Sequence, residues 1–118
     1  MNRAALSALG ALLLLAGCHS ASIVATLHNG SPGEIRLVEL DYPSASFGTG
    51  SITPGSSYTY RFKVLGSGPT KLTFLDPAGK EHTSAGPELH EGLEGQLQID
   101  VTGTDENVQW TPKFLPKP

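Results

Sequence analysis

The feature that most constrains the fold of this chain is a two-residue alternation of apolar and polar side chains. In the segment 57–64 two tyrosines, a phenylalanine and a valine occupy the even positions, and polar or charged residues occupy the odd ones. The segment 95–102 repeats the alternation with leucine, isoleucine and valine. Successive side chains of a strand point to opposite faces of a sheet, so each segment predicts a strand with one buried face.

Five weaker strand candidates bring the expected number to about seven. They cover the ranges 23–28, 35–42, 71–75, 81–84 and 107–110. Within 35–42 the apolar residues change from odd to even positions, which predicts a β-bulge or a strand that is buried on both faces.

Turn sequences separate these candidates and indicate how the strands are joined. Asp76-Pro77-Ala78-Gly79 has the residues that a type I turn prefers, and it is expected to join two antiparallel strands. Asn29-Gly30 is interpreted as the turn of another hairpin. Prolines after Trp110 predict that strand pairing ends there, leaving residues 111–118 as an extended tail that docks Phe114 and Leu115 on the domain.

About seven short strands between turns predict an all-β fold, a single small antiparallel β-sandwich over residues 23–110. The pattern is similar to that of the immunoglobulin-like domains of exported bacterial proteins, although no cysteine pair surrounds a core tryptophan. A transthyretin-like or other related Greek-key sandwich would give nearly the same pattern.

Residues 1–17 have the layout of an export signal. Arg3 is followed by an uncharged, mostly apolar run that ends at Ala16, and this run is shorter than the roughly 20 residues that span a bilayer. The sequence Leu15-Ala16-Gly17-Cys18 then resembles the lipobox of bacterial lipoproteins. The resemblance implies cleavage between Gly17 and Cys18, a diacylglycerol on the Cys18 thiol and an acyl chain on the new amino terminus. The alternative is an ordinary buried cysteine, either behind a plain secretory signal or inside an apolar helix that is not cleaved.

A lipid at Cys18 would hold the domain close to a membrane. Residues 18–22 form a tether that spans no more than about 17 Å, and two or three acyl chains give stable attachment. His19, rather than an aspartate, follows the cysteine, which favours the outer membrane under the sorting rule of enteric-type lipoproteins. Cys18 is the only cysteine, so no intramolecular disulfide can form.

The charge of the chain argues against some partners. Removal of the leader takes away Arg3 alone among the charged residues, which leaves 101 residues with seven basic and eleven acidic side chains. The formal charge of −4 disfavours nucleic acid and anionic lipid surfaces.

The sequence contains no catalytic motif, such as a nucleophile elbow or a phosphate-binding loop, so we do not expect an enzyme or a cofactor beyond the covalent lipid. The one constellation with metal-binding chemistry consists of four residues that could converge if the loop 86–95 folds back. They are His82, Glu88, His90 and Glu91. The simpler interpretation is a solvated acidic loop that buries only Leu89 and Leu93.

The sequence thus predicts a membrane-anchored envelope lipoprotein that acts as a non-catalytic binding or structural module. Its expected partner is another envelope protein or component. Arg61 and Lys63 could meet an acidic partner, but pairing with carboxylates on a neighbouring strand is the expected arrangement. The alternative function is metal or small-ligand binding by the residues of the 82–91 region.

Overall fold

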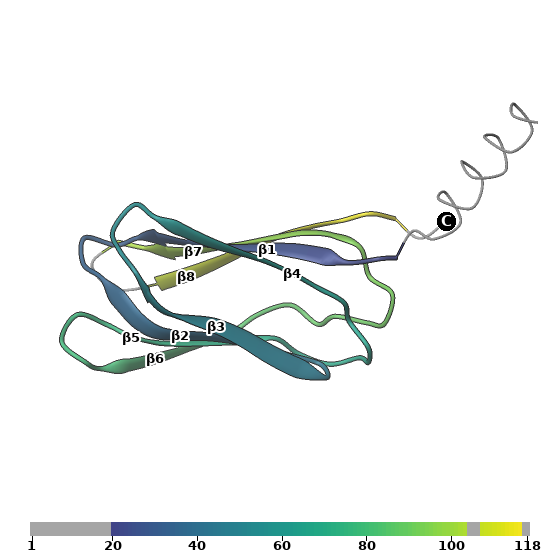
Figure 1. Cartoon of the computed structure of the whole chain (residues 1–118), viewed down its shortest axis with the longest axis horizontal. Helices are drawn as coiled ribbons and strands as arrows, with labels where there is room; N and C mark the ends of the chain where they lie inside the picture. Colours follow the sequence, from purple (N-terminus) through teal and green to yellow (C-terminus); the bar gives the residue numbers. More distant parts are fainter. Residues whose placement is uncertain (1–19, 104–106, 117–118) are drawn as a thin grey trace, which may run out of the picture.

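The computed structural model describes residues 20–103 and 107–116, which form two facing four-stranded sheets (Figure 1). The strands are β1 (Ile23–Gly30), β2 (Ile35–Tyr42), β3 (Ala45–Ile52), β4 (Ser57–Phe62), β5 (Lys71–Leu75), β6 (Glu81–Ala85), β7 (Gly95–Thr102) and β8 (Asn107–Phe114). One sheet has the order β4-β1-β7-β8 and the other has the order β3-β2-β5-β6. The predicted all-β sandwich is confirmed, with eight strands instead of seven because Ala45–Ile52 adds one.

The strand order defines which kind of sandwich this is. Every neighbouring pair is antiparallel except β1 and β7, which run parallel. β1 and β2 belong to different sheets, whereas the first two strands of a constant-type immunoglobulin domain share one sheet. The strand order therefore differs from that of a constant-type immunoglobulin domain.

The core lies between the sheets and follows the predicted alternation. Buried apolar side chains come from every other position of the central strands β1, β7 and β5, together with β2. They include Ile23, Ala25, Leu27, Leu97, Ile99, Val101, Leu72, Phe74, Val38 and Leu40. Because successive side chains alternate between faces, the intervening residues of these strands are less buried and lie on the outer faces of the sheets.

The predicted irregularity in 35–42 is a β-bulge in β2. The register between β2 and β5 shifts between Arg36 and Glu39, so β2 contains one extra residue there. Leu37 takes up the extra length with a left-handed backbone (φ 47°). Its side chain points to solvent while Ile35 and Val38 are both buried, which explains the change of apolar parity in the sequence.

Asn29-Gly30 does not form the predicted hairpin. β1 continues through both residues, and the chain then crosses from one sheet to the other before β2 begins. The buried Asn29 side chain holds this corner: its Nδ2 donates to the carbonyls of Gly33 (2.8 Å) and Ile52 (2.9 Å). Its Oδ1 accepts from the backbone N–H and the hydroxyl of Ser31. Asparagine is used here to satisfy buried backbone groups, not to permit a tight turn.

The turn after β5 has the predicted form. It joins β5 and β6, which pair antiparallel, and Gly79 N–H donates to the Asp76 carbonyl over 2.9 Å. Gly79 has a left-handed backbone (φ 85°), which glycine adopts without strain.

The prediction that pairing ends after Trp110 is wrong. β8 extends to Phe114, and Pro112 lies opposite Leu97 in the pairing with β7. β8 is an edge strand, where a residue without an N–H is tolerated because one side of the strand has no partner. Phe114 packs against the core as expected, whereas Leu115 is exposed.

The two sheets are fastened together along the side formed by β6 and β8. Trp110 Nε1 in β8 donates to Ser84 Oγ in β6 over 2.9 Å. Gly86 lies under the indole, since a β-carbon at that position would approach Cζ3 of Trp110 to 2.5 Å. The tryptophan therefore closes this side of the sandwich, and aromatic rings close the opposite side.

Candidate functional site

β3 forms an edge that is open to another strand. It is the outermost strand of its sheet, so one row of its backbone N–H and C=O groups has no neighbouring strand. Its sequence, ASFGTGSI, contains neither a charged residue nor a proline. Charge and proline are common means of blocking sheet edges, so β3 is suited to pairing with an added strand.

The other three edge strands differ from β3 in this respect. β4 carries Arg61, β6 carries Glu81, and β8 carries both Pro112 and Lys113. Among the eight described strands, β3 is therefore the one edge without a blocking residue. The contrast indicates that its openness is a feature of this edge and not of the whole domain.

A shallow hollow of about 410 Å³ lies beside the β3 edge, at the bulge of β2. The Leu37 side chain on its rim is 66% exposed. Gly48 forms part of the lining, and a β-carbon at this position would overlap the carbonyl oxygen of Val38. Gly50 also lines it, and a β-carbon there would meet open space. An exposed leucine on a strained backbone is an arrangement that stability alone does not favour, so it points to function.

Five aromatic rings support the β3 edge from behind by filling the space between β3 and β4. The Phe47 ring centroid lies 4.4 Å from that of Tyr60 and 5.5 Å from that of Phe62. Tyr42 packs on Phe62 at 4.3 Å, and Tyr58 lies 6.4 Å from Phe47. Burial raises the pKa of Tyr42, and the nearby Tyr60 raises it further. Tyr60 is 41% exposed and brings part of this cluster to the surface.

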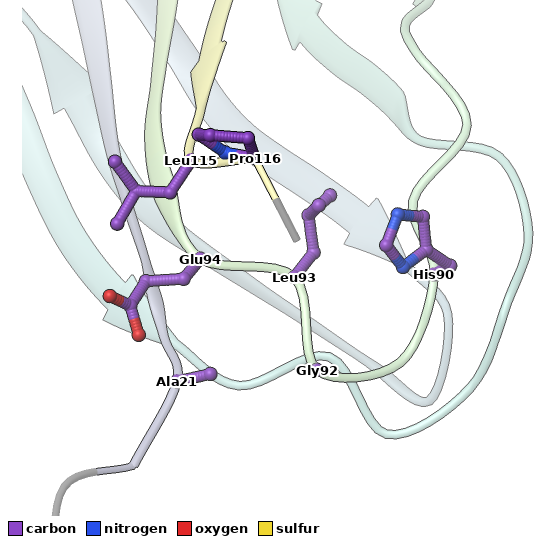
Figure 2. A pocket seen from close by; sticks show the side chains of 7 residues that line it. All are labelled: Ala21, His90, Gly92, Leu93, Glu94, Leu115 and Pro116. Carbon is purple, nitrogen blue, oxygen red and sulfur yellow. The ribbon is translucent and has the colours of Figure 1, made fainter. Parts of the chain in front are cut away.

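A second hollow, of about 350 Å³, lies at the end of the sandwich where β1 begins. Its walls come from Ala21, the loop 90–94 and the two residues after β8 (Figure 2). Figure 2 shows the His90 ring and the Glu94 carboxylate on opposite sides of Leu93. The hollow therefore offers mainly aliphatic surface and no converging pair of these two groups.

The structure does not bring the four candidate metal ligands together. His82 lies in β6, while the other three candidates lie in the loop that follows. Across residues 20–103 and 107–116, no group of three or more His, Cys, Asp or Glu side chains is arranged to hold a metal ion. The simpler interpretation of the loop fits its burial: Leu89 and Leu93 are in the core, and Glu88 and Glu91 are exposed.

His82 has a structural partner in Asp76, which the sequence did not indicate. Its Nε2 lies 2.9 Å from Asp76 Oδ2, and its ring stacks on Phe74 with the centroids 5.2 Å apart. The other carboxylate oxygen accepts from the backbone N–H groups of Ala78 and Lys80. The hydrogen bond from His82, followed by that from Lys80, holds the pKa of Asp76 below its usual value. Asp76 and His82 therefore stabilise the turn between β5 and β6.

Arg61 does not form the expected pair with a carboxylate on a neighbouring strand. Arg61 Nη1 donates to the hydroxyl of Ser22 over 2.9 Å, next to the start of β1. An ion pair between strands occurs elsewhere, between Lys71 of β5 and Asp41 of β2 at 3.7 Å. Both of its side chains are exposed, and such pairs contribute little to stability.

The predicted cleavage and lipidation residues, Gly17 and Cys18, lie outside the described residues, so both assignments remain predictions. Within the described ranges, the chain has no helix with the length and apolar character needed to cross a membrane.

No protein-family model, curated protein or solved structure matches this chain. Function must therefore be inferred from its own residues and geometry. The sequence did not predict β3. Its two buried residues, Phe47 and Ile52, fall at positions of different parity with two glycines between them, so the segment lacks the two-residue alternation of a strand. A usable signal was present: the chain carries no charge from residue 42 to residue 60.

Proposed function

We propose that this protein is a lipoprotein of the bacterial cell envelope, anchored through Cys18, whose sandwich is a non-catalytic binding module. The lipobox-like sequence Leu15-Ala16-Gly17-Cys18 supports the anchor, and His19 favours the outer membrane. The partner is another envelope protein, which adds an extended segment to the edge of β3.

The bare edge of β3 carries the binding part of this proposal. A strand added to a sheet edge gains affinity from main-chain hydrogen bonds and specificity from pockets that receive alternate side chains. β3 is eight residues long, and the N–H and C=O groups of its alternate residues point away from β2 with no strand partner. The hollow beside Leu37 can receive an apolar side chain of the incoming segment. The aromatic cluster behind Phe47 holds the edge in place, so little ordering is required when the partner binds.

The test is crosslinking of the full-length protein in intact cells from a photoreactive residue at Ser51, an exposed position of β3, with mass spectrometry of the products. Gly50→Lys places a charge on the edge, in space that a β-carbon can enter freely. Thr111→Lys is the matched control, because it adds the same charge at an exposed position of the β8 edge.

A specific envelope protein that is crosslinked in the parent and in Thr111→Lys, and is lost in Gly50→Lys, supports the proposal. Equal crosslinking in all three proteins removes the β3 edge from consideration. No partner above background contradicts the binding module itself. The anchor is tested separately with Cys18→Ala. This variant protein should be absent from the membrane fraction, and its mass should lack that of the lipid.

A further inference from the structure

One end of the sandwich exposes aliphatic side chains. Leu65, in the connection between β4 and β5, is 64% exposed, and Leu115, after β8, is 56% exposed. Among the described residues, the other exposed large apolar side chains are Leu37 and Tyr60, which belong to the region of the β3 edge. Leu65 and Leu115 therefore need an explanation of their own.

Backbone hydrogen bonds hold the segments that carry these two leucines to one loop. The N–H of Gly92, in the loop between β6 and β7, donates to the Val64 carbonyl over 3.3 Å. The N–H of Leu115 donates to the Glu94 carbonyl over 2.8 Å. Leu65 and Leu115 thus project from one connected end of the domain, the end that includes the aliphatic hollow of Figure 2.

The same end holds the start of the described chain. The N–H of Gly95 donates to the Ser22 carbonyl over 3.1 Å, which fixes the residue just before β1 against the start of β7. Figure 1 shows β1 beginning and β8 finishing at this end. A lipid on Cys18 lies no more than about 17 Å along the chain from Ser22, so it would hold this end at the membrane.

We infer that this end of the sandwich sits in the headgroup region of the bilayer that holds the anchor, with Leu65 and Leu115 reaching its apolar boundary. The inference rests on the proposed lipid anchor. Transfer of aliphatic side chains into that boundary is favourable. The anchor already holds the domain at the membrane, so most of the translational entropy lost on binding is not lost a second time. The domain is then held in one orientation instead of swinging on its tether.

The charges at this end specify the kind of lipid. Glu88 and Glu91 are exposed on the loop between β6 and β7, and Lys63 is exposed on the segment that leads to Leu65. Arg61, Glu94 and Lys113 line the neighbouring hollow that also includes Ser22 and Leu115. These three carboxylates and three cationic groups balance, so this end has no net positive charge to favour an anionic surface. The fitting surface is a leaflet of zwitterionic lipid.

The experiment uses the full-length lipidated protein in phosphatidylcholine vesicles. Lipidation occupies Cys18, so Leu65→Cys and Leu115→Cys each carry a single free thiol. Leu37→Cys is the matched control, because Leu37 is exposed to nearly the same extent as Leu65 (66% against 64%) but lies on the β2 bulge. Each thiol is treated with a charged maleimide, and a second sample is labelled with bimane in vesicles that contain brominated phosphatidylcholine.

The expected result is several-fold slower alkylation at positions 65 and 115 than at 37, together with bimane quenching by brominated lipid at 65 and 115 only. Equal alkylation at 65 and 37 on vesicle-bound protein overturns the orientation while leaving the anchor intact. Protection without quenching also overturns it, since another protein would then cover this end. A protein that carries no lipid and does not float with vesicles contradicts both the anchor and the orientation.

Discussion

Replacement of Asn29 by alanine should be among the most damaging single changes in this domain. The Asn29 side chain is fully buried and takes part in four hydrogen bonds that join the end of β1 to the crossing segment and to the end of β3. Alanine removes all four and leaves the Gly33 and Ile52 carbonyls and the Ser31 N–H without these partners. A buried polar group left unpaired costs about 1–3 kcal/mol, so a total loss of about 3–5 kcal/mol is expected.

That loss is a large part of the free energy of unfolding of a small domain, which is typically about 5–15 kcal/mol. Urea unfolding of the protein in detergent, followed by Trp110 fluorescence, measures it. With a slope of about 1.5 kcal/mol per molar urea, a loss of 3 kcal/mol lowers the midpoint by about 2 M. Ser31→Ala, which removes only the hydroxyl contacts, should cost about 1 kcal/mol.

Asn107→Ala is the surface control, because Asn107 is exposed at the first position of β8, and it should change stability by less than about 0.5 kcal/mol. If Asn29→Ala costs no more than Asn107→Ala, the side chain does not hold the corner and the reasoning above is refuted. A reduced slope with an unchanged midpoint would instead indicate a change in the unfolded state.

Two further predictions concern the bulge and the turn. Leu37→Gly removes the strain of a left-handed leucine backbone, which is about 1–2 kcal/mol. Glycine has a larger entropy in the unfolded state, so the net effect should be a gain in stability of about 0.5–1 kcal/mol, and loss of the exposed side chain should weaken crosslinking to the partner. A Leu37→Gly protein that is less stable than the parent in urea unfolding would contradict the assigned strain. The pKa of Asp76 is lowered in the folded state, so the ionised carboxylate stabilises the domain at pH values above the usual aspartate range, and this contribution is lost as the pH falls through about 4 and below. The urea midpoint of Asp76→Asn should therefore fall less between pH 5 and about pH 3 than the midpoint of the parent. Equal decreases in the two midpoints would refute the role of this carboxylate.

Alternation predicted the strands whose pattern reflects burial on one face. β7 was recognised because Leu97, Ile99 and Val101 are buried at every other position. β3 was missed because it changes face opposite the β2 bulge, which leaves Phe47 and Ile52 buried at positions of different parity. Such a change depends on the neighbouring strand, so a segment read in isolation does not reveal it.

Two other differences have the same origin in tertiary context. Asn29-Gly30 has the composition of a hairpin turn, but its asparagine serves buried carbonyls that become neighbours only after the sheets pack. Pro112 would interrupt a central strand, and it is accepted because β8 has a partner on one side only. Pro112 is tolerated because of the position of β8 at the edge of its sheet, and the local amino-acid composition does not encode that position. For the same reason the sequence does not reveal that β3 is an edge strand, although the stretch from residue 42 to residue 60 carries no charged side chain.

The two proposed surfaces together limit where a partner can lie. β3 starts beside the end that carries Leu65, since Pro43, just before β3, lies next to Gly68 of the β4 to β5 connection, where an added β-carbon would come within 3.5 Å of the proline ring. From there β3 runs toward the opposite end of the sandwich for eight residues, a length of about 26 Å. If the Leu65 end rests on the bilayer, the open edge rises from the membrane surface and stays within a few tens of ångströms of it. The partner must then present its extended segment next to the membrane, which favours another envelope protein anchored in the same leaflet over one that diffuses freely.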